Sequence, residues 1–342
     1  MGTRRRRVSV IRSRSKPVKW DDLRMEIISN PTHDEIKKAA KALKDGHLVA
    51  FPTETVYGLG GDATNEKAVS RIYSVKGRPT DHPLIVHISS IDQLEKWAID
   101  IPDYALQLAK KFWPGPMTLI LKRSDLAKDF ITGAQDNVGI RVPAHPVALS
   151  LLTEFEIIGG LGVVAPSANI FGAVSPTTLD AVRIEIGNFL EPKDLLVEGG
   201  DCRVGIESSI IDCTGQLPKI LRPGAVTITM MEDSTGVNVL RKIEQNSIRV
   251  SGSLKSHYSP KAKIVIDKKP KPGDGFLALS NIPTPIGVIR LASPDNFDEY
   301  ARVLYKSFRL ADSKKLSKIV VVIPQGDEIA IAIRDRIYKA SN

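Results

Sequence analysis

The chain has 342 residues, of which 42% are hydrophobic and 25% charged, and its formal net charge is +9. This is the composition of an ordinary globular protein, and no apolar run approaches the roughly 18 residues that a membrane-spanning helix needs. Two cysteines are too few for a disulfide framework or a four-thiolate zinc site, so we expect a reducing compartment, a cytoplasmic location and a metal-free fold.

The excess basic charge is concentrated in residues 1–20, which contain eight arginines and lysines and no acidic residue. Residues 21–342 hold 40 basic and 39 acidic side chains, a net charge of +1. The segment has features of a transit peptide, with a basic tail or an over-extended start as alternatives. We expect residues 1–30 to form a basic extension that is disordered at least in part. The basic pI is therefore no evidence for nucleic-acid binding.

Helices and strands alternate from about residue 31. Thr32 can cap a helix that stops at Gly46. This alternation predicts a mixed α/β domain over residues 31–224. The other expected helices are 65–75, 103–112, 145–155 and 177–186, and the expected strands are 47–51, 83–88, 117–122, 138–142, 162–165, 194–198, 207–213 and 219–222.

The periodicity weakens after Gly224, which predicts a linker over 225–261 with at most a short helix near 236–245. A second α/β pattern covers residues 262–342. Its order predicts a small, Rossmann-like parallel sheet. The expected strands here are 262–266, 287–290 and 318–323, and the expected helices are 297–310 and 327–340.

Polar and glycine-rich segments follow several expected strands. The sequence has no GxxxxGK[ST], GxGxxG, HExxH or GxSxG motif. Because α/β sheets bind ligands at strand ends, these segments form the candidate site. The alternatives are a satisfied turn or a solvated basic loop, and, for Ser175 and Thr177, a helix cap. The segments are 52–61, 76–84, 137–143, 164–169, 175–178, 207–209 and 221–224.

Arg141 lies inside an otherwise apolar strand, where a charge is rarely buried unpaired. It meets either an internal carboxylate or an anionic ligand. We favour the ligand, because strand alternation places Asn137, Gly139 and Arg141 on one face. Lys76 and Arg78 would suit a polyphosphate, the lysine as a point charge and the arginine as a bidentate fork.

The motifs, taken in order, resemble the YrdC/YwlC/Sua family. They are PTETVYGLG, KGRPTDHPLIVHI, WPGPMTLIL, VGIRVPAH, APSAN, SPTT, ESSIID and LRPG. The pairing of Lys-x-Arg with Ser-x-Asn at Lys76, Arg78, Ser167 and Asn169 is the most characteristic part, and these four are the implied catalytic residues. The resemblance implies a YrdC-like twisted mixed sheet with helices. The stretch SGSLKSHYSP resembles the linker that closes over the active site in the family's long, two-domain form.

Members of this family are nucleotidyltransferases that join L-threonine, bicarbonate or CO2, and ATP into L-threonylcarbamoyl-AMP. The product passes to a tRNA threonylcarbamoyltransferase complex, for N6-threonylcarbamoyladenosine at position 37 of tRNAs that read ANN codons. Mg2+ is expected with ATP, and no protein-held metal. An RNA-binding protein without synthase activity is the alternative, and direct tRNA binding stays open. The resemblance places Thr55, His87, Arg141, Ala165 and Ser208 at threonine, and Arg78, His82, Asn137, Ser167, Ser175, Arg222 and Ser251 at ATP.

Overall fold

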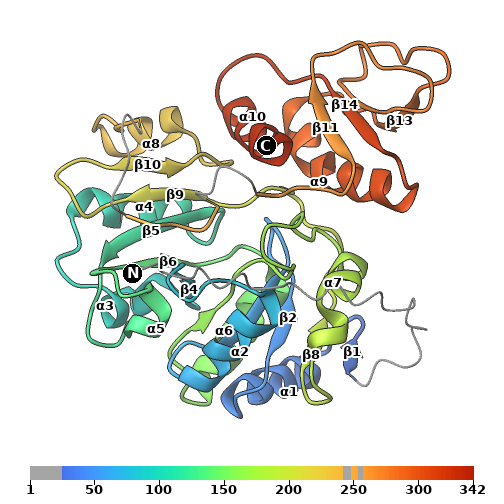
Figure 1. The fold of residues 1–342 in the computed structure, drawn as a ribbon. Helices are drawn as coiled ribbons and strands as arrows, with labels where there is room; N and C mark the ends of the chain where they lie inside the picture. Colours follow the sequence, from blue (N-terminus) through green and yellow to red (C-terminus); the bar gives the residue numbers. More distant parts are fainter. Residues whose placement is uncertain (1–24, 242–247, 253–256) are drawn as a thin grey trace, which may run out of the picture.

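The computed structural model describes residues 25–241, 248–252 and 257–342 and contains two sheets (Figure 1). The larger sheet, with its helices, forms the N-terminal domain, and the smaller one forms the C-terminal domain from residue 263 onward. The expected mixed α/β fold with a small parallel C-terminal sheet is confirmed. Across the described ranges, no helix is both long and apolar enough to cross a membrane.

The large sheet has ten strands, of mixed direction. Parallel pairs join β1 to β8, β8 to β2, β4 to β6 and β5 to β9, and the other neighbours are antiparallel. In spatial order the strands are β1 (Glu26–Ile28), β8 (Leu195–Val197), β2 (Val49–Phe51), β3 (Gly58–Asp62), β7 (Val163–Val164), β4 (Ile85–His87), β6 (Asn137–Arg141), β5 (Met117–Lys122), β9 (Ser209–Asp212) and β10 (Lys219–Arg222).

Both faces of this sheet are covered. Along β2, Val49 and Phe51 pack with helices α1 and α6, whereas Leu48 and Ala50 belong to the core on the opposite face. Thr32 caps α1 with a capping box, and Gly46 follows its end at φ 88°, as expected. The helices are α1 (His33–Lys44), α2 (Glu66–Lys76), α3 (Leu94–Trp97), α4 (Asp103–Phe112), α5 (Asp129–Thr132), α6 (Pro146–Ile157), α7 (Leu179–Ile186) and α8 (Ile228–Thr235), with 3-10 turns at Ile91–Gln93 and Gly187–Phe189.

Several local features differ from the sequence expectations. Residues 26–28, expected in the N-terminal extension, form edge strand β1 against β8. The glycines of residues 58–61, which the sequence places in a ligand-binding segment or a turn, lie in strand β3. Those glycines serve close packing, since a Cβ at Gly60 would lie 2.7 Å from Phe51. Thr178, rather than Ser175 or Thr177, caps α7.

The linker helix lies earlier than expected. Thr227 caps α8, and Gly236 ends it at φ 70°, so the described residues 236–241 do not form the helix expected near 236–245. The sequence signals were a capping threonine at Thr227 and a helix-ending glycine at Gly236. The rest of the expected helix, residues 242–245, lies outside the described ranges, as do residues 246–247, 1–24 and 253–256.

The C-terminal domain contains a four-stranded sheet in which all neighbours are parallel. Helices α9 (Phe297–Ser313) and α10 (Ile329–Ser341) accompany it, and α9 and α10 also make contacts to the N-terminal domain. Figure 1 shows this domain, in orange and red, next to β9 and β10. In spatial order the strands are β11 (Lys263–Ile266), β14 (Lys318–Val321), β12 (Gly275–Leu277), which was not expected, and β13 (Ile289–Ala292).

Candidate functional site

One small cavity, of about 50 Å3, collects side chains from strand ends throughout the N-terminal domain and from the linker; we call it the central cavity. The strand-end loops place polar groups here because the sheet brings distant segments to one edge. Its lining consists of Thr55, Val56, Arg78, Ile85, His87, Arg141, Ala165, Pro166, Ser167, Glu207, Ser208, Arg222, Ser251, Gly252, His257 and Tyr258.

Arg141, on β6, is buried and paired with a carboxylate of the protein itself. Its Nη2 donates to Oε1 of Glu54 at 2.6 Å, its Nη1 to the hydroxyl of Thr55 at 3.0 Å, and its Nε to the Gly115 carbonyl at 3.2 Å. Arg141 is therefore paired with the internal carboxylate of Glu54. Our prediction that a ligand, and not an internal carboxylate, would pair with Arg141 was wrong. These bonds use three of the five N–H groups of a guanidinium, so two remain for a ligand.

Arg78 and Arg222 form a cationic wall of the central cavity. Arg78 donates through Nη2 to the Pro83 carbonyl at 2.9 Å and to the Ser251 hydroxyl at 3.1 Å. Arg222 donates to the carbonyl and hydroxyl of Ser208, at 2.9 and 3.1 Å, and to the Ser251 carbonyl at 3.0 Å. Burial lowers the pKa of Arg78 to about 10, so it stays cationic at neutral pH. Ser251 of the linker thus bridges the two arginines.

Several buried polar atoms around the central cavity have no hydrogen-bond partner among the described residues. These include Nδ1 of His87, Nδ1 of His257 and the hydroxyl of Tyr258. Burial is the main cause that lowers the pKa of both histidines to about 3, so both are neutral at physiological pH. Since buried polar groups in native proteins are normally satisfied, this cluster fits a site for a polar ligand.

Comparisons with known proteins match both parts of the chain. A family model described as telomere recombination matches residues 41–224, and the model for the C-terminal domain of threonylcarbamoyl-AMP synthase matches residues 225–342. The threonylcarbamoyl-AMP synthase of Pyrococcus abyssi is 37% identical over 326 residues, which cover 90% of this chain and 94% of that protein.

The chain belongs to the threonylcarbamoyl-AMP synthase family.

Two further relatives support this membership. The threonylcarbamoyl-AMP synthase of Bacillus subtilis is 42% identical over 236 residues, covering 68% of this chain and 66% of that protein. The crystal structure of Pyrococcus abyssi Sua5 complexed with L-threonine superposes with a TM-score of 0.83 at 34% identity, over 93% of this chain and 97% of that one. The expectations of the long two-domain form and of a nucleotidyltransferase are confirmed, and the RNA-binding alternative is not favoured.

The family's motif residues do not all reach the central cavity. All five residues expected at threonine line it, together with Arg78, Ser167, Arg222 and Ser251. Asn137 instead lines a small neighbouring cavity that also contains Ser251. The ring of His82 lies edge-on to Phe171, with centroids 5.2 Å apart. Lys76, Asn169 and Ser175 are buried behind the lining.

Lys76 and Asn169 shape the loop that carries Ser167. The Lys76 ammonium, fully buried at the end of α2, donates to the backbone carbonyls of Ser167 and Asn169. The Asn169 amide donates to the carbonyls of Ile170 and Ala173, at 2.8 and 2.9 Å. Burial, reinforced by the charge of Arg78, lowers the pKa of Lys76. Lys76 of the Lys-x-Arg part thus binds the backbone of the Ser-x-Asn part, which explains why the two parts occur together. It does not face the central cavity as a point charge.

Sequence reasoning missed Tyr305 and Arg336, and it placed Glu54 and Glu207 in candidate segments without their pairing partners. Glu54 pairs with Arg141, and Glu207 lies beside Ser208 with its carboxylate held by Arg336 and Tyr305 of the C-terminal domain, at 2.8 and 2.9 Å. A signal for Arg336 was available. It shares the apolar stripe of α10 with buried Ile333, Ile337 and Ala340, so its charge needed an internal partner.

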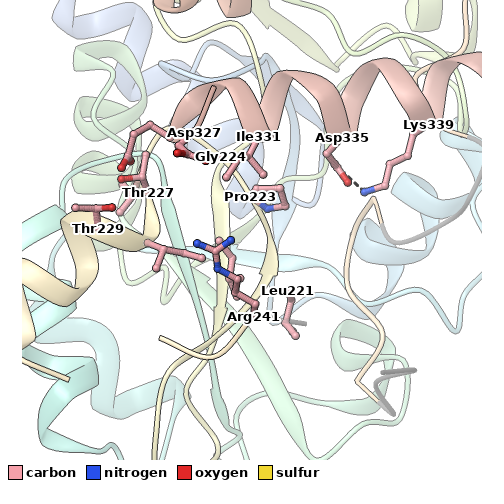
Figure 2. A pocket seen from close by; sticks show the side chains of 14 residues that line it. Leu221, Pro223, Gly224, Thr227, Thr229, Arg241, Asp327, Ile331, Asp335 and Lys339 are labelled. Carbon is pink, nitrogen blue, oxygen red and sulfur yellow. Dashed lines mark hydrogen bonds and ion pairs between the residues drawn. The ribbon is translucent and has the colours of Figure 1, made fainter. Parts of the chain in front are cut away.

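A larger cavity, of about 470 Å3, lies between β10, α8 and α10. Its lining includes Leu221, Pro223 and Gly224 of the LRPG motif but none of the residues expected at threonine or ATP. Figure 2 shows Asp335 and Lys339 of α10 joined by an ion pair on one side, with Thr227 and Asp327 on the other. Its lining mixes both signs of charge without the unsatisfied buried atoms of the central cavity. We therefore place the chemistry in the central cavity.

Proposed function

We propose that this protein synthesises L-threonylcarbamoyl-AMP from L-threonine, bicarbonate or CO2, and ATP, with release of pyrophosphate. One observation carries the proposal. The residues expected at threonine, represented by Thr55, His87 and Arg141, share one buried cavity with the cationic pair Arg78 and Arg222. An amino acid and a nucleotide triphosphate bound to these two sets would meet within it.

The reaction needs no covalent enzyme intermediate. The threonine nitrogen attacks the carbon of CO2 and loses a proton, which gives a carbamate; from bicarbonate, water is also released. A carbamate oxygen then attacks the α-phosphorus of ATP, and the bond from that phosphorus to the bridging oxygen breaks as pyrophosphate leaves. Positioning and charge stabilisation are the expected sources of catalysis for such a transfer.

The threonine side of the site has a complementary set of groups. Arg141 retains two N–H donors, which suit the threonine carboxylate, while Glu54 holds the guanidinium in place. His87 is neutral and its Nδ1 lacks a partner among the described residues, so it can bind a hydroxyl or an ammonium group. Ser208, whose hydroxyl also contacts Thr118 at 2.8 Å, completes this side.

The ATP side is cationic. Arg78 and Arg222 would bind phosphate oxygens, and Ser167 would add a hydroxyl near the reacting α-phosphate. Mg2+ would enter with ATP, held by phosphate oxygens and water. Among the described residues of the lining, the one acidic side chain is Glu207, and it is bound to Arg336 and Tyr305. The ion would neutralise charge on the departing pyrophosphate.

The central cavity is small. Its volume of about 50 Å3 is far below the roughly 300–1,000 Å3 of pockets that bind drug-sized ligands. Linker residues Ser251, Gly252, His257 and Tyr258 occupy part of its wall. ATP binding at these residues would therefore require the linker side chains to shift outward. The product would pass to a tRNA threonylcarbamoyltransferase, because a mixed anhydride of this kind is a reactive group donor.

Product detection tests the proposal. The full-length protein is incubated with ATP, Mg2+, bicarbonate and L-threonine, and L-threonylcarbamoyl-AMP is measured by mass spectrometry. We expect product only when threonine is present, so a reaction without threonine separates synthesis from ATP hydrolysis. Absence of product with all substrates present would overturn the proposal.

Two substitutions assign the product to this site. Loss of a charge-assisted hydrogen bond costs about 1.5–3 kcal/mol, so Arg78→Ala and Arg141→Ala should each reduce pyrophosphate release at least tenfold. Arg123→Ala is the matched control, because Arg123 binds Asp129 and the Ala127 carbonyl away from the central cavity. Near-normal release in both site variants would show that the chemistry lies elsewhere.

A further inference from the structure

Two hydroxyl groups in the lining of the central cavity each contact a threonine that lies behind it. The Ser208 hydroxyl lies 2.8 Å from that of Thr118 on β5, and the Thr55 hydroxyl lies 2.8 Å from that of Thr53, which follows β2. Thr53 and Thr118 are buried and do not line the cavity. The distances alone do not show which oxygen of each pair donates, but the other hydrogen bonds of these groups do.

The bond between the first pair runs from Thr118 to Ser208. Thr118 is fully buried, and Ser208 supplies the only acceptor that its hydroxyl meets among the described residues. If Ser208 donated instead, the Thr118 proton would be buried without a partner, at the full desolvation penalty of a hydroxyl donor. Ser208 Oγ also accepts from Arg222 Nη2 at 3.1 Å, so both of its lone pairs are used. The Ser208 proton, which meets no other acceptor in the described part of the chain, is left for a ligand.

Thr55 has the opposite arrangement. Thr53 donates its one hydroxyl proton to the Val56 carbonyl at 2.6 Å, so it cannot also donate to Thr55. The bond between the two threonines therefore runs from Thr55 to Thr53. Arg141 donates to Thr55 Oγ1 at 3.0 Å, which uses one of the two lone pairs of that oxygen. The other lone pair is left for a ligand, so Thr55 faces the cavity as an acceptor.

We propose that Thr53 and Thr118 are positioning residues that give the central cavity a fixed hydrogen-bond polarity, in which Thr55 accepts and Ser208 donates. A hydroxyl group normally serves in either role, because it rotates to suit its partner. The threonine behind each lining hydroxyl removes this freedom before a ligand binds. A ligand must therefore present a donor to Thr55 and an oxygen acceptor to Ser208, and it does not have to reorient either group.

This polarity selects atoms of the substrates, a step that rests on the proposed function. An amino or hydroxyl group of threonine suits Thr55. An anionic oxygen suits Ser208, because the neighbouring Arg222 is a cation. That oxygen comes either from the threonine carboxylate or from a phosphate of ATP, and separate binding measurements with the two substrates distinguish these sources.

Neutron diffraction tests the polarity directly, on crystals of the deuterated full-length protein grown without substrates. We expect the deuterium of Thr118 to point at Ser208 and that of Ser208 to point into the cavity. The deuterium of Thr55 should point at Thr53. A Ser208 deuterium directed at Thr118, or a Thr55 deuterium directed into the cavity, would overturn the inference. The measurement needs no synthesis, so missing product refutes the proposed function, whereas a reversed hydroxyl refutes the polarity.

Substitutions at Thr118 test whether the polarity matters for binding. Thr118→Val keeps the shape of the side chain and removes its hydroxyl, whereas Thr118→Ser keeps the hydroxyl and removes a methyl group. Calorimetry measures the affinity for L-threonine and, separately, for α,β-methylene-ATP. We expect Thr118→Val to weaken one of these affinities roughly threefold to tenfold, because Ser208 is then held by Arg222 alone. Thr118→Ser should lower the thermal unfolding midpoint and keep both affinities within twofold.

Substitutions at Thr53 test the acceptor in the same way. Thr53→Val should weaken L-threonine binding by a similar factor, because Thr55 loses the acceptor of its proton and can turn that proton toward the ligand. Thr53→Ser should keep the wild-type affinity. Thr132→Val is the matched control, since Thr132 is buried and its hydroxyl accepts from Arg123 at 3.2 Å, outside the lining of the central cavity. It should change neither affinity.

The pattern of losses decides the inference. Ser208→Ala combined with Thr118→Val should be no worse than Ser208→Ala alone, because Thr118 acts through Ser208. A loss confined to L-threonine assigns the anionic oxygen to its carboxylate, and a loss confined to the nucleotide assigns it to a phosphate. Equal losses of both affinities, fully additive effects in the double variant, or equal affinities in Thr118→Val and Thr118→Ser would contradict positioning. If Thr53→Val does not fold, Thr118→Val and the neutron map still decide the question.

Discussion

The two domains contribute to the site in different ways. In the N-terminal domain the site residues lie at strand ends and in the loops after them, as Arg141 at the end of β6 and Arg222 at the end of β10 show. In the C-terminal domain they lie in the middle of helices, where Tyr305 and Arg336 project from apolar stripes across the interface. Strand ends place groups in the wall of the central cavity, whereas Tyr305 and Arg336 of the helices contact that wall through Glu207 and the Pro223 carbonyl.

We expect the largest effect on catalysis from a comparison of two arginines, one in each domain. Each binds several backbone oxygens. Arg222 holds Ser208 and the linker residue Ser251 beside the central cavity, whereas Arg290 donates to the carbonyls of Ala278 and Ala292 within the C-terminal domain. Arg222→Met should lower kcat/KM for ATP roughly tenfold to 150-fold, the equivalent of about 1.5–3 kcal/mol. Steady-state kinetics measure this change.

Arg290→Met is the control for that substitution. It should lower the unfolding midpoint and leave kcat/KM nearly unchanged, because its lost bonds lie within one domain. The comparison between the domains breaks down if Arg290→Met impairs catalysis as strongly as Arg222→Met at a temperature where both are folded.

A second prediction concerns the docking of the domains. Gly205 packs against α9 so closely that a Cβ there would lie 2.4 Å from the Cα of Arg302. Gly205→Ala should therefore push the helix away and lower the free energy of unfolding by about 1–3 kcal/mol. Tyr305, on the same helix, donates to Glu207 in the wall of the central cavity, so we expect KM for ATP to rise as well. Urea unfolding and steady-state kinetics measure the two effects.

Gly200→Ala provides the matched control. Gly200 has φ 79°, close to the 81° of Gly205, but a Cβ there would meet no atom within 4 Å. Both alanines carry the same backbone strain, so the difference between the variants isolates the contact with α9. Equal losses of stability would show that strain, and not domain docking, explains the effect of Gly205→Ala.

Features set by local sequence patterns could be predicted, whereas contacts between distant segments could not. Strands such as Met117–Lys122 and helices such as Asp103–Phe112 carry local periodic patterns, and their predicted bounds match the structure. Residues that line the central cavity could be named because they belong to motifs at strand ends. The ion-pair partner of Arg141 was harder to predict, because Glu54 is 87 positions away in the sequence and the fold brings the two together.

Other features have no local signature at all. Strand β3 is made of residues 58–62, in which glycines hide the apolar alternation that marks a strand. The burial of Lys76 against two carbonyls reverses the usual interpretation of a basic loop as a ligand contact. Glu207 gains its role only when α9 and α10 dock on it, and nothing near it in the sequence encodes that contact.

The smallest expected effect is on the pH dependence of stability, and it compares His87 of β4 with His257 of the linker. Burial is the first cause that lowers the pKa of both His87 and His257 to about 3, against about 6.5 in the unfolded chain. Between these values the unfolded state binds protons that the folded state does not, so stability falls as pH decreases from 6.5 toward 3. Each histidine should account for about 1 kcal/mol of the loss between pH 6.5 and 5.5.

Urea unfolding of His87→Gln, His257→Gln and the double variant at these two pH values measures each share. Each single variant should lose about 1 kcal/mol less than the wild type over this interval, and the double variant about twice that. An unchanged loss in His257→Gln alone would mean that its ring is protonated within the folded protein. The linker would then shield its histidine less than β4 shields His87, and the central cavity would be open to water on the linker side.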